Sequence, residues 1–195
     1  MNVHPIEAES YRILASRLDL RHLAQGTRAV VERVIHASAD LSYADTLVVN
    51  DAAVAAGVAA LAAGAPVVVD VAMVAAGITS VVTECFLAAT EPSADSDTTR
   101  SATAMRAAAS RHPEGAVFVI GCAPTALTAL VDLAAAGTVR PALVIGMPVG
   151  FVGAAESKEA LRRSGLAAIS NVGEKGGSAV AAAALNALVR LAGTS

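Results

Sequence analysis

Short apolar, β-branched runs recur along the chain and alternate with longer stretches of helical periodicity. Four runs have the composition of buried strands, at residues 66–71, 116–120, 142–146 and 167–170, and residues 81–86 make a fifth candidate. Helical stretches lie at residues 5–17, 27–38, 51–63, 99–111, 124–136, 153–163 and 176–191. Apolar strands separated by helix-length segments are typical of a mostly parallel sheet covered on both faces. The pattern predicts an α/β fold, a three-layer α-β-α single domain over residues 1–195.

The turns that follow two of these strands are rich in glycine and proline. The run ending at Ile120 continues as Gly-Cys-Ala-Pro-Thr, and the run ending at Ile145 continues as Gly-Met-Pro-Val-Gly-Phe-Val-Gly. Glycine allows the backbone to approach a ligand closely, although each turn alone could be an ordinary strand-to-helix connection. Because ligands of such folds gather beyond the carboxyl ends of the strands, we expect a glycine-lined pocket there. The longest loop is expected at residues 91–99, which are rich in Pro, Ser, Asp and Thr.

Composition and charge exclude several classes of protein. The chain is 55% hydrophobic, but no apolar run approaches the about 20 residues needed to span a bilayer, so no membrane segment is expected. A net charge of −3 argues against a general nucleic-acid binder. The start of the chain lacks a secretory pattern, and Cys85 and Cys122 lie in apolar segments as expected for buried, reduced thiols, so a cytoplasmic location is predicted. Phosphate-loop, nucleophile-elbow and metal-ligand spacings are absent, and neither a metal nor a nucleotide is expected.

His36 is the first candidate for chemistry. It lies near the end of the stretch 27–38, on a face that it shares with Ala29, Arg33 and Asp40, beside the apolar stripe of the same helix. A histidine beside an arginine and near a carboxylate is a tunable acid or base close to neutral pH. The alternative is a partly exposed histidine that the helix dipole stabilises.

Arg100 and Ser10 are candidates for ligand contacts. Arg100 opens a helix that Asp97, Thr98 or Thr99 could cap, and its guanidinium would add donors to the free N–H groups of the first turn. Such a helix start would receive a carboxylate, although a solvated surface arginine has the same pattern. Ser10 lies on the apolar side of the first helix, where its hydroxyl either bonds back to the helix or faces a ligand.

Long segments of the chain match one known family. Residues 143–158 read Leu-Val-Ile-Gly-Met-Pro-Val-Gly-Phe-Val-Gly-Ala-Ala-Glu-Ser-Lys, and Val-Ile-His-Ala surrounds His36. Thr-Arg-Ser-Ala begins at Thr99, Gly-Gly-Ser-Ala begins at Gly176, and residues 70–78 also agree. Together these segments resemble the precorrin-8X methylmutase family, also called precorrin isomerase, over essentially the whole chain. One departure is that Val172 and Glu174 stand where basic residues are common in the family.

The resemblance implies a function and its residues. It implies an isomerase of cobalamin biosynthesis that moves a methyl group from C11 to C12 of precorrin-8X, giving hydrogenobyrinate, or of its cobalt form, giving cobyrinate, with no cofactor. His36 would be the catalytic acid, and the substrate contacts would be Ser10, Arg33, Thr79 and Arg100. Lys158 is expected with the arginines at the rim of the cleft, where the carboxylates of the macrocycle would bind.

The resemblance also implies partners. We expect a homodimer with sites at the subunit interface and a hand-over of the product to the next enzyme of the pathway. A non-catalytic tetrapyrrole-binding carrier and a nucleotide-binding α/β protein are the alternatives. Intact His36 and Arg100 speak against the first alternative, and the missing phosphate loop speaks against the second.

Overall fold

The fold is built around a central six-stranded sheet. The computed structural model describes residues 4–91 and 98–193, and within them the strand order is β1-β6-β5-β4-β2-β3. All neighbouring strands are parallel except the edge strand β1, which runs antiparallel to β6. The strands are β1 (Leu47–Val48), β2 (Val67–Val69), β3 (Thr83–Cys85), β4 (Val117–Ile120), β5 (Leu143–Gly146) and β6 (Ala168–Asn171).

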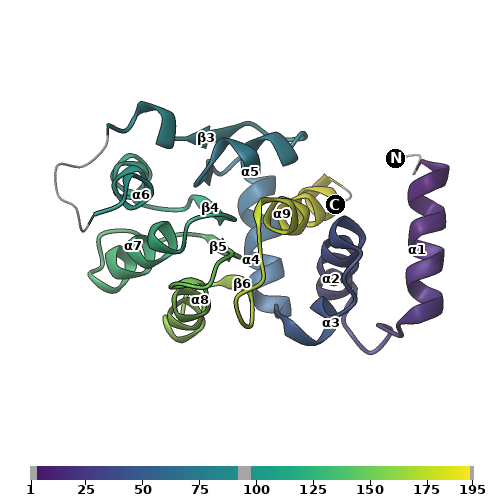
Figure 1. Cartoon of the computed structure of the whole chain (residues 1–195). Helices are drawn as coiled ribbons and strands as arrows, with labels where there is room; N and C mark the ends of the chain where they lie inside the picture. Colours follow the sequence, from purple (N-terminus) through teal and green to yellow (C-terminus); the bar gives the residue numbers. More distant parts are fainter. Residues whose placement is uncertain (1–3, 92–97, 194–195) are drawn as a thin grey trace.

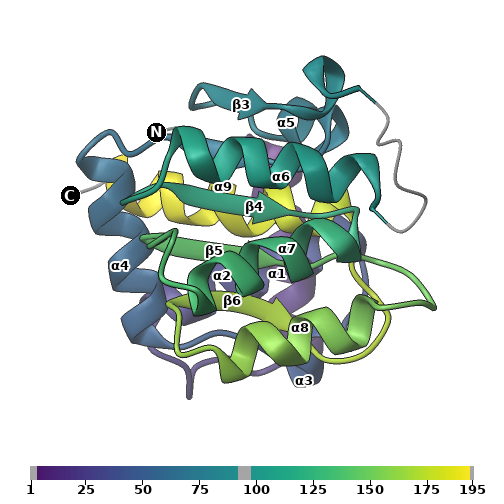
Figure 2. The same cartoon turned by 90° about the vertical axis from the view of Figure 1, so that its left-hand side faces the viewer.

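Helices cover both faces of this sheet, as Figures 1 and 2 show. One layer contains α6 (Arg100–Arg111), α7 (Pro124–Ala135) and α8 (Ala154–Arg163). The other contains α4 (Asp51–Ala62), α5 (Ala72–Gly77) and α9 (Ser178–Gly193), and α2 (Gln25–Ser38) packs along α9. The helix α1 (Pro5–Arg17) lies outermost against α2, and the short α3 (Tyr43–Thr46) leads into β1. The predicted three-layer α/β class is therefore confirmed.

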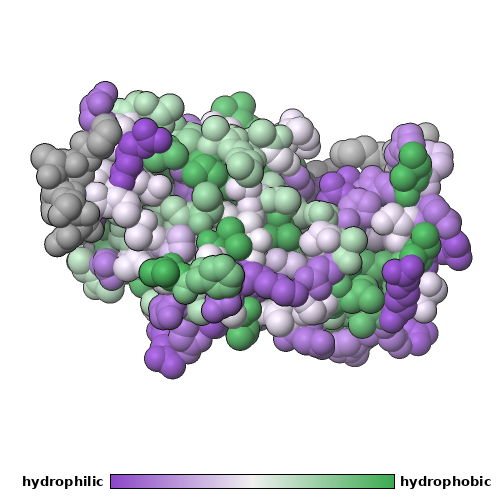
Figure 3. All heavy atoms as spheres, in the orientation of Figure 1, coloured by the Kyte–Doolittle hydropathy of each residue, from purple (hydrophilic) through white to green (hydrophobic). Residues whose placement is uncertain are grey.

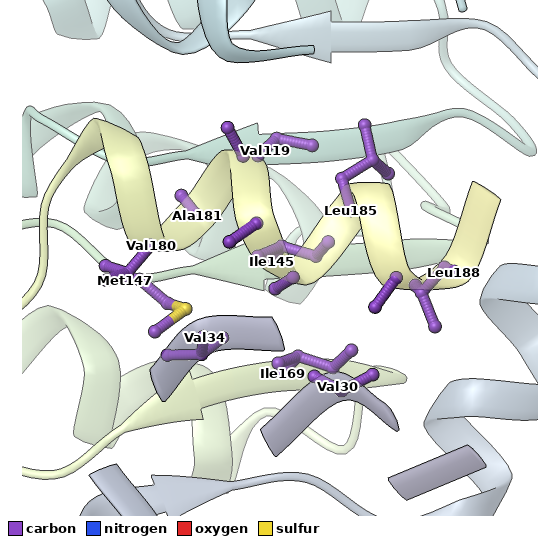
Figure 4. Packing of buried hydrophobic residues seen from close by; sticks show 14 of the residues in the cluster. Val30, Val34, Val119, Ile145, Met147, Ile169, Val180, Ala181, Leu185 and Leu188 are labelled. Atoms are coloured by element: carbon purple, nitrogen blue, oxygen red, sulfur yellow. The ribbon is translucent and has the colours of Figure 1, made fainter. Parts of the chain in front are cut away.

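The central strands are buried on both faces, which explains their continuous apolar sequences. Successive side chains of a strand point to opposite faces, so Val119 and Ile145 meet α9 and α2, whereas Phe118 and Val144 meet α6, α7 and α8. Alanine is the commonest residue of α9, and these small side chains let the helix lie close to the sheet and to α2. Figure 4 shows this packing, with its labelled members Val30, Val34, Val119, Ile145, Met147, Ile169, Val180, Ala181, Leu185 and Leu188.

Several details differ from the sequence-based expectations. All five predicted strands are present, but the pattern missed β1, α3, α5 and the 3-10 helix Leu87–Ala89. Each of these elements is short, and β1 exists only because the distant β6 pairs with it.

Cys85 is half-buried and Cys122 is exposed, so the prediction of two buried thiols was wrong: Cys122 lies in the loop after β4, outside the strand. Most of the loop predicted at 91–99, residues 92–97, and the candidate cap Asp97 lie outside the described residues. None of the helices in the described part is long and apolar enough to span a membrane.

Candidate functional site

The imidazole of His36 is held by two neighbouring side chains of α1. His36 lies in the last turn of α2, and the Oγ atom of Ser10 lies 2.8 Å from its Nδ1 atom. The ring of Tyr11 stacks on the imidazole, with centroids 5.1 Å apart and planes 17° from parallel. The Ser10 hydroxyl thus contacts His36 instead of bonding back to its own helix. Since Ser10 engages Nδ1, and no described residue forms a hydrogen bond with Nε2, the Nε2 atom is the one available to exchange a proton with a ligand.

Charged residues of three helices surround this histidine. Glu7 of α1 accepts a hydrogen bond from Arg33 of α2 at 2.8 Å and another from Arg190 of α9 at 2.7 Å. Asp40, which the sequence suggested as the nearby carboxylate, instead accepts from Lys175. The carboxylate that influences His36 is therefore Glu7, which the sequence pattern did not single out.

Burial and the two arginines lower the pKa of His36. Desolvation is the largest cause, and repulsion from Arg33 and Arg190 acts in the same direction, while the charge of Glu7 opposes them. A lowered pKa makes the imidazolium a readier proton donor. The same shift lowers the fraction of His36 that is protonated at a given pH.

A small hollow opens beside His36 between α1 and α2. Its volume is about 120 Å³, and its lining includes Ser10, Ile13, Ile35, His36 and Leu41. Ligand pockets commonly measure about 300–1,000 Å³. The hollow thus suits one substituent or one edge of a ligand and is too small for a whole macrocycle.

Arg100 is the first residue of α6, as predicted, but within a single chain it lies away from His36. Thr99 caps the helix, because its Oγ1 atom accepts from the N–H of Ala102 at 3.2 Å. Arg100 is exposed, and α6 covers the face of the sheet opposite to that on which α2 and α1 lie (Figures 1 and 2). Thr79 is also exposed. It lies between α5 and β3, and β3 is the edge strand on the opposite side of the sheet from β1. The structure therefore brings Ser10, Arg33 and His36 together and leaves Thr79 and Arg100 apart from them.

Buried Asp70, at the end of β2, organises the loop that positions the α6 start. Its carboxylate accepts from the backbone N–H groups of Gly121 at 3.1 Å, Cys122 at 2.8 Å and Ala123 at 2.8 Å. This loop leads into α7, whose Thr125 lies 2.7 Å, Oγ1 to Oγ1, from the α6 cap Thr99. Burial raises the pKa of Asp70, and the three backbone donors oppose that rise. The sequence signal for such a group is an aspartate that directly follows an apolar run, here Val67–Val69.

Lys158 is not at the rim, which corrects the expectation from the sequence. Its side chain is fully buried, and its Nζ atom donates to the carbonyl of Lys175 at 2.5 Å and to Asn171 Oδ1 at 3.3 Å. The ammonium of Lys175 in turn donates to Asp40 at 2.6 Å and to Ser42 at 2.9 Å. The helix position after the glycine-rich turn made Lys158 look accessible, but α8 turns it inward against β6. Lys158 therefore stabilises the loop before α9, which Lys175 ties to the end of α2.

The loops at the carboxyl ends of the strands expose apolar side chains. Phe151 is 90% exposed and Val152 is 88% exposed in the glycine-rich turn after β5, and Val172 is half-exposed after β6. Figure 3 shows this face as a mixture, with hydrophobic patches over its middle and hydrophilic side chains gathered over α1. At the edge that contains Val172, the surface is therefore partly apolar.

The fold and site define an α/β protein in which a serine of one helix orients a histidine of the next helix, beside two arginines that share one glutamate. The model of the family described as precorrin-8X methylmutase matches residues 5–191. The precorrin-8X methylmutase of Pseudomonas aeruginosa is 41% identical over 94% of this chain and 93% of its own length, and the cobalt-precorrin-8 methylmutase of Priestia megaterium is 38% identical over 96% and 87%. The crystal structure of the precorrin-8X methylmutase from Thermus thermophilus superposes with a TM-score of 0.84 at 39% identity, covering 98% of both chains. The chain belongs to the precorrin-8X methylmutase family and is an isomerase of cobalamin biosynthesis.

Proposed function

We propose that this enzyme moves the methyl group at C11 of precorrin-8X, or of its cobalt form, to C12, with His36 as the general acid. The observation that carries the assignment is the hydrogen bond between Ser10 Oγ and His36 Nδ1, because it orients the ring and leaves Nε2 for the substrate. The carbon–methyl bond breaks at C11 and forms at C12, while Nε2 donates its proton to a ring nitrogen as the conjugation of the macrocycle reorganises. Substrate and product are isomers, so the macrocycle also releases one proton, and Nε2 takes one up again to complete the cycle. General acid catalysis of this kind contributes about 10²–10⁴-fold to a rate.

The reaction requires the chain to bind and orient a large polycarboxylate and to supply one proton. Nothing is oxidised and no methyl donor enters, so no cofactor is part of the proposal. Arg33 beside His36 and Arg100 at the α6 start supply positive charge for the carboxylates, and Ser10 and Thr79 supply hydroxyl groups. Release of the coloured product to the next enzyme of the pathway belongs to the same proposal.

A homodimer with shared sites is the second part of the proposal. The hollow beside His36 measures only about 120 Å³, and α6, which begins at Arg100, lies on the other face of the sheet, so one copy offers an incomplete enclosure for a macrocycle. A second copy that places its Arg100 and Thr79 opposite His36 would complete the site. Sedimentation should then give the mass of a dimer.

Mixing two variants that each turn over poorly at low substrate concentration tests the shared site directly. In a dimer formed from His36→Ala and Arg100→Ala chains, one of the two sites would be intact, so random mixing should restore about one quarter of the parent activity. This result is expected at substrate concentrations far below the KM of the Arg100 variant. If both residues serve the same site within one chain, mixing restores nothing.

Turnover with both substrate forms tests the reaction itself. The purified chain is incubated separately with precorrin-8X and with cobalt-precorrin-8, and the absorption spectrum of the corrin product is followed, with His36→Ala in parallel. Both forms are needed because the relatives carry both names. A chain that binds hydrogenobyrinate tightly but converts neither substrate would instead be a tetrapyrrole carrier. The predicted cytoplasmic location is checked separately by cell fractionation.

A further inference from the structure

One carboxylate oxygen of Glu7 accepts hydrogen bonds from two arginines that lie on different helices. Glu7 Oε1 accepts from Nη1 of Arg33 at 2.8 Å and from Nη1 of Arg190 at 2.7 Å. The exposed fractions of the side chains are 18% for Glu7, 21% for Arg33 and 44% for Arg190, so the cluster is half-buried. Two guanidinium groups around one carboxylate leave this cluster with a net positive charge in a chain whose net charge is −3.

The donors of Arg33 exceed what Glu7 uses. A guanidinium presents its N–H groups as a planar fork that suits a carboxylate bound through both oxygens. The Nε atom of Arg33 is buried and lacks a hydrogen-bond partner among the described residues. A buried donor without a partner is costly, which indicates that Glu7 is an incomplete ligand for this arginine.

A hollow of about 370 Å³ gives access to the same arginines. It lies between α1, α2 and α9, and Tyr11, Arg33 and Arg190 line it together with Ala187, Leu191 and Glu32, whose carboxylate lies 3.9 Å from Arg28. Tyr11 also stacks on His36, so one residue of the lining is in contact with the proposed acid. A carboxylate arriving through this hollow would reach both guanidinium groups next to the reacting ring.

We propose that Arg33 and Arg190 form a receptor for one carboxylate of the substrate, which Glu7 fills in this structure and which the substrate enters by displacing Glu7. The inference rests on the proposed function, since it requires a polycarboxylate ligand, and it adds Arg190 as a binding residue. Exchange of one carboxylate for another preserves the charge balance of the cluster. It also requires little unpacking, because Leu14 is the only buried residue of α1.

A purely structural role of Glu7 makes a different prediction. If Glu7 only ties α1 to α2 and α9, removing either partner breaks the same tether, and Glu7→Gln and Arg190→Met should impair product binding alike. If Glu7 competes with the substrate, the two variants should change product affinity in opposite directions. Both variants should lower the midpoint of thermal unfolding in either case. The unfolding midpoint therefore reports the loss of the contact between the helices, and only the product affinity distinguishes the two roles of Glu7.

The experiment compares parent, Glu7→Gln and Arg190→Met by titration with hydrogenobyrinate and by steady-state kinetics. Glu9→Gln is the matched control, because Glu9 lies on the same helix and pairs with Arg12 at the surface. We expect Glu7→Gln to bind the product several-fold more tightly and Arg190→Met about 10- to 100-fold more weakly, as for loss of a charge-assisted hydrogen bond. Arg190→Met should raise KM and leave kcat near the parent value, and Glu9→Gln should match the parent.

Weaker or unchanged product binding by Glu7→Gln, or unchanged binding by Arg190→Met, would overturn the receptor. Should Arg190→Met fail to fold, Arg190→Lys keeps the charge but loses the fork and should still raise KM. A parent chain that binds no hydrogenobyrinate and converts neither substrate would refute the proposed function itself, which distinguishes that failure from a failure of this inference.

Discussion

The hydroxyl of Ser10 lies 2.8 Å from Nδ1 of His36, although the two residues lie 26 positions apart on two different helices. This contact fixes which imidazole nitrogen faces a substrate. Ser10→Ala should therefore fold normally and lower kcat about 2- to 10-fold, the range expected for one part-buried hydrogen bond.

Ser16→Ala is the control for that change. Ser16 lies on the same helix and is exposed, and its hydroxyl donates to the carbonyl of Ile13 at 2.7 Å. Single-turnover formation of the corrin chromophore should be unchanged in this variant. A Ser10→Ala enzyme as fast as Ser16→Ala would show that the imidazole does not need the hydroxyl.

The pH dependence of the reaction should report the protonation of His36. Its pKa lies below the ordinary 6.5, because burial and the arginines disfavour the charged form. Only the imidazolium can donate, so kcat/KM should rise as pH falls and level off below that lowered pKa. In the complex, the carboxylates of the substrate favour the imidazolium, and the kcat profile should be displaced to higher pH.

Replacing the acid tests the same assignment. His36→Ala should lose nearly all methyl migration at every pH and still bind hydrogenobyrinate, because other groups hold the ring. His22→Ala, at an exposed position between α1 and α2, should behave as the parent. Turnover by His36→Ala within a few-fold of the parent would leave binding and orientation as the source of catalysis.

Arg100 should contribute to affinity rather than to the chemical step. Arg100→Ala should weaken binding of hydrogenobyrinate by about 1.5–3 kcal/mol, the value of a hydrogen bond to a charged group. Arg106→Ala, at an exposed position of the same helix, is the matched control and should bind as the parent does. Equal affinities for the two variants, measured by titration at one ionic strength, would remove Arg100 from the site.

The sequence predicted the sheet well because its central strands are apolar on both faces. Runs such as Val67–Val69 and Val117–Ile120 have no other stable place than between two helical layers. The edge strand Leu47–Val48 could not be predicted, because it depends on pairing with β6 more than 100 residues later. Short elements with few local signals are therefore where the pattern failed.

The site was predicted in part, for a related reason. Helical spacing placed Arg33 and His36 on one face of α2, since both lie on the same helix. Spacing could not show that α1 folds back to supply Ser10, Tyr11 and Glu7, because the angle at which two helices pack depends on the whole core. The same limit explains Lys158, whose burial follows from the packing of α8 on β6.

Lys158 provides a prediction about stability. Its pKa falls from the ordinary 10.5 to about 8, first because burial disfavours the ammonium and second because Arg162 repels it. Between these two values the unfolded chain binds a proton at this position that the native chain does not bind. Stability therefore rises with pH wherever the unfolded state holds the extra proton.

The measurement compares chemical unfolding of the parent and Lys158→Met between pH 8 and 10.5. Titrations of tyrosine and cysteine occur in both proteins and cancel in the difference. The free energy of unfolding of the parent, relative to the variant, should increase across this range by about 2–3 kcal/mol, since each pKa unit corresponds to about 1.4 kcal/mol. A difference that stays constant with pH would mean that Lys158 keeps its ordinary pKa, and that its ammonium is as well accommodated between Asn171 and the loop before α9 as it is in water.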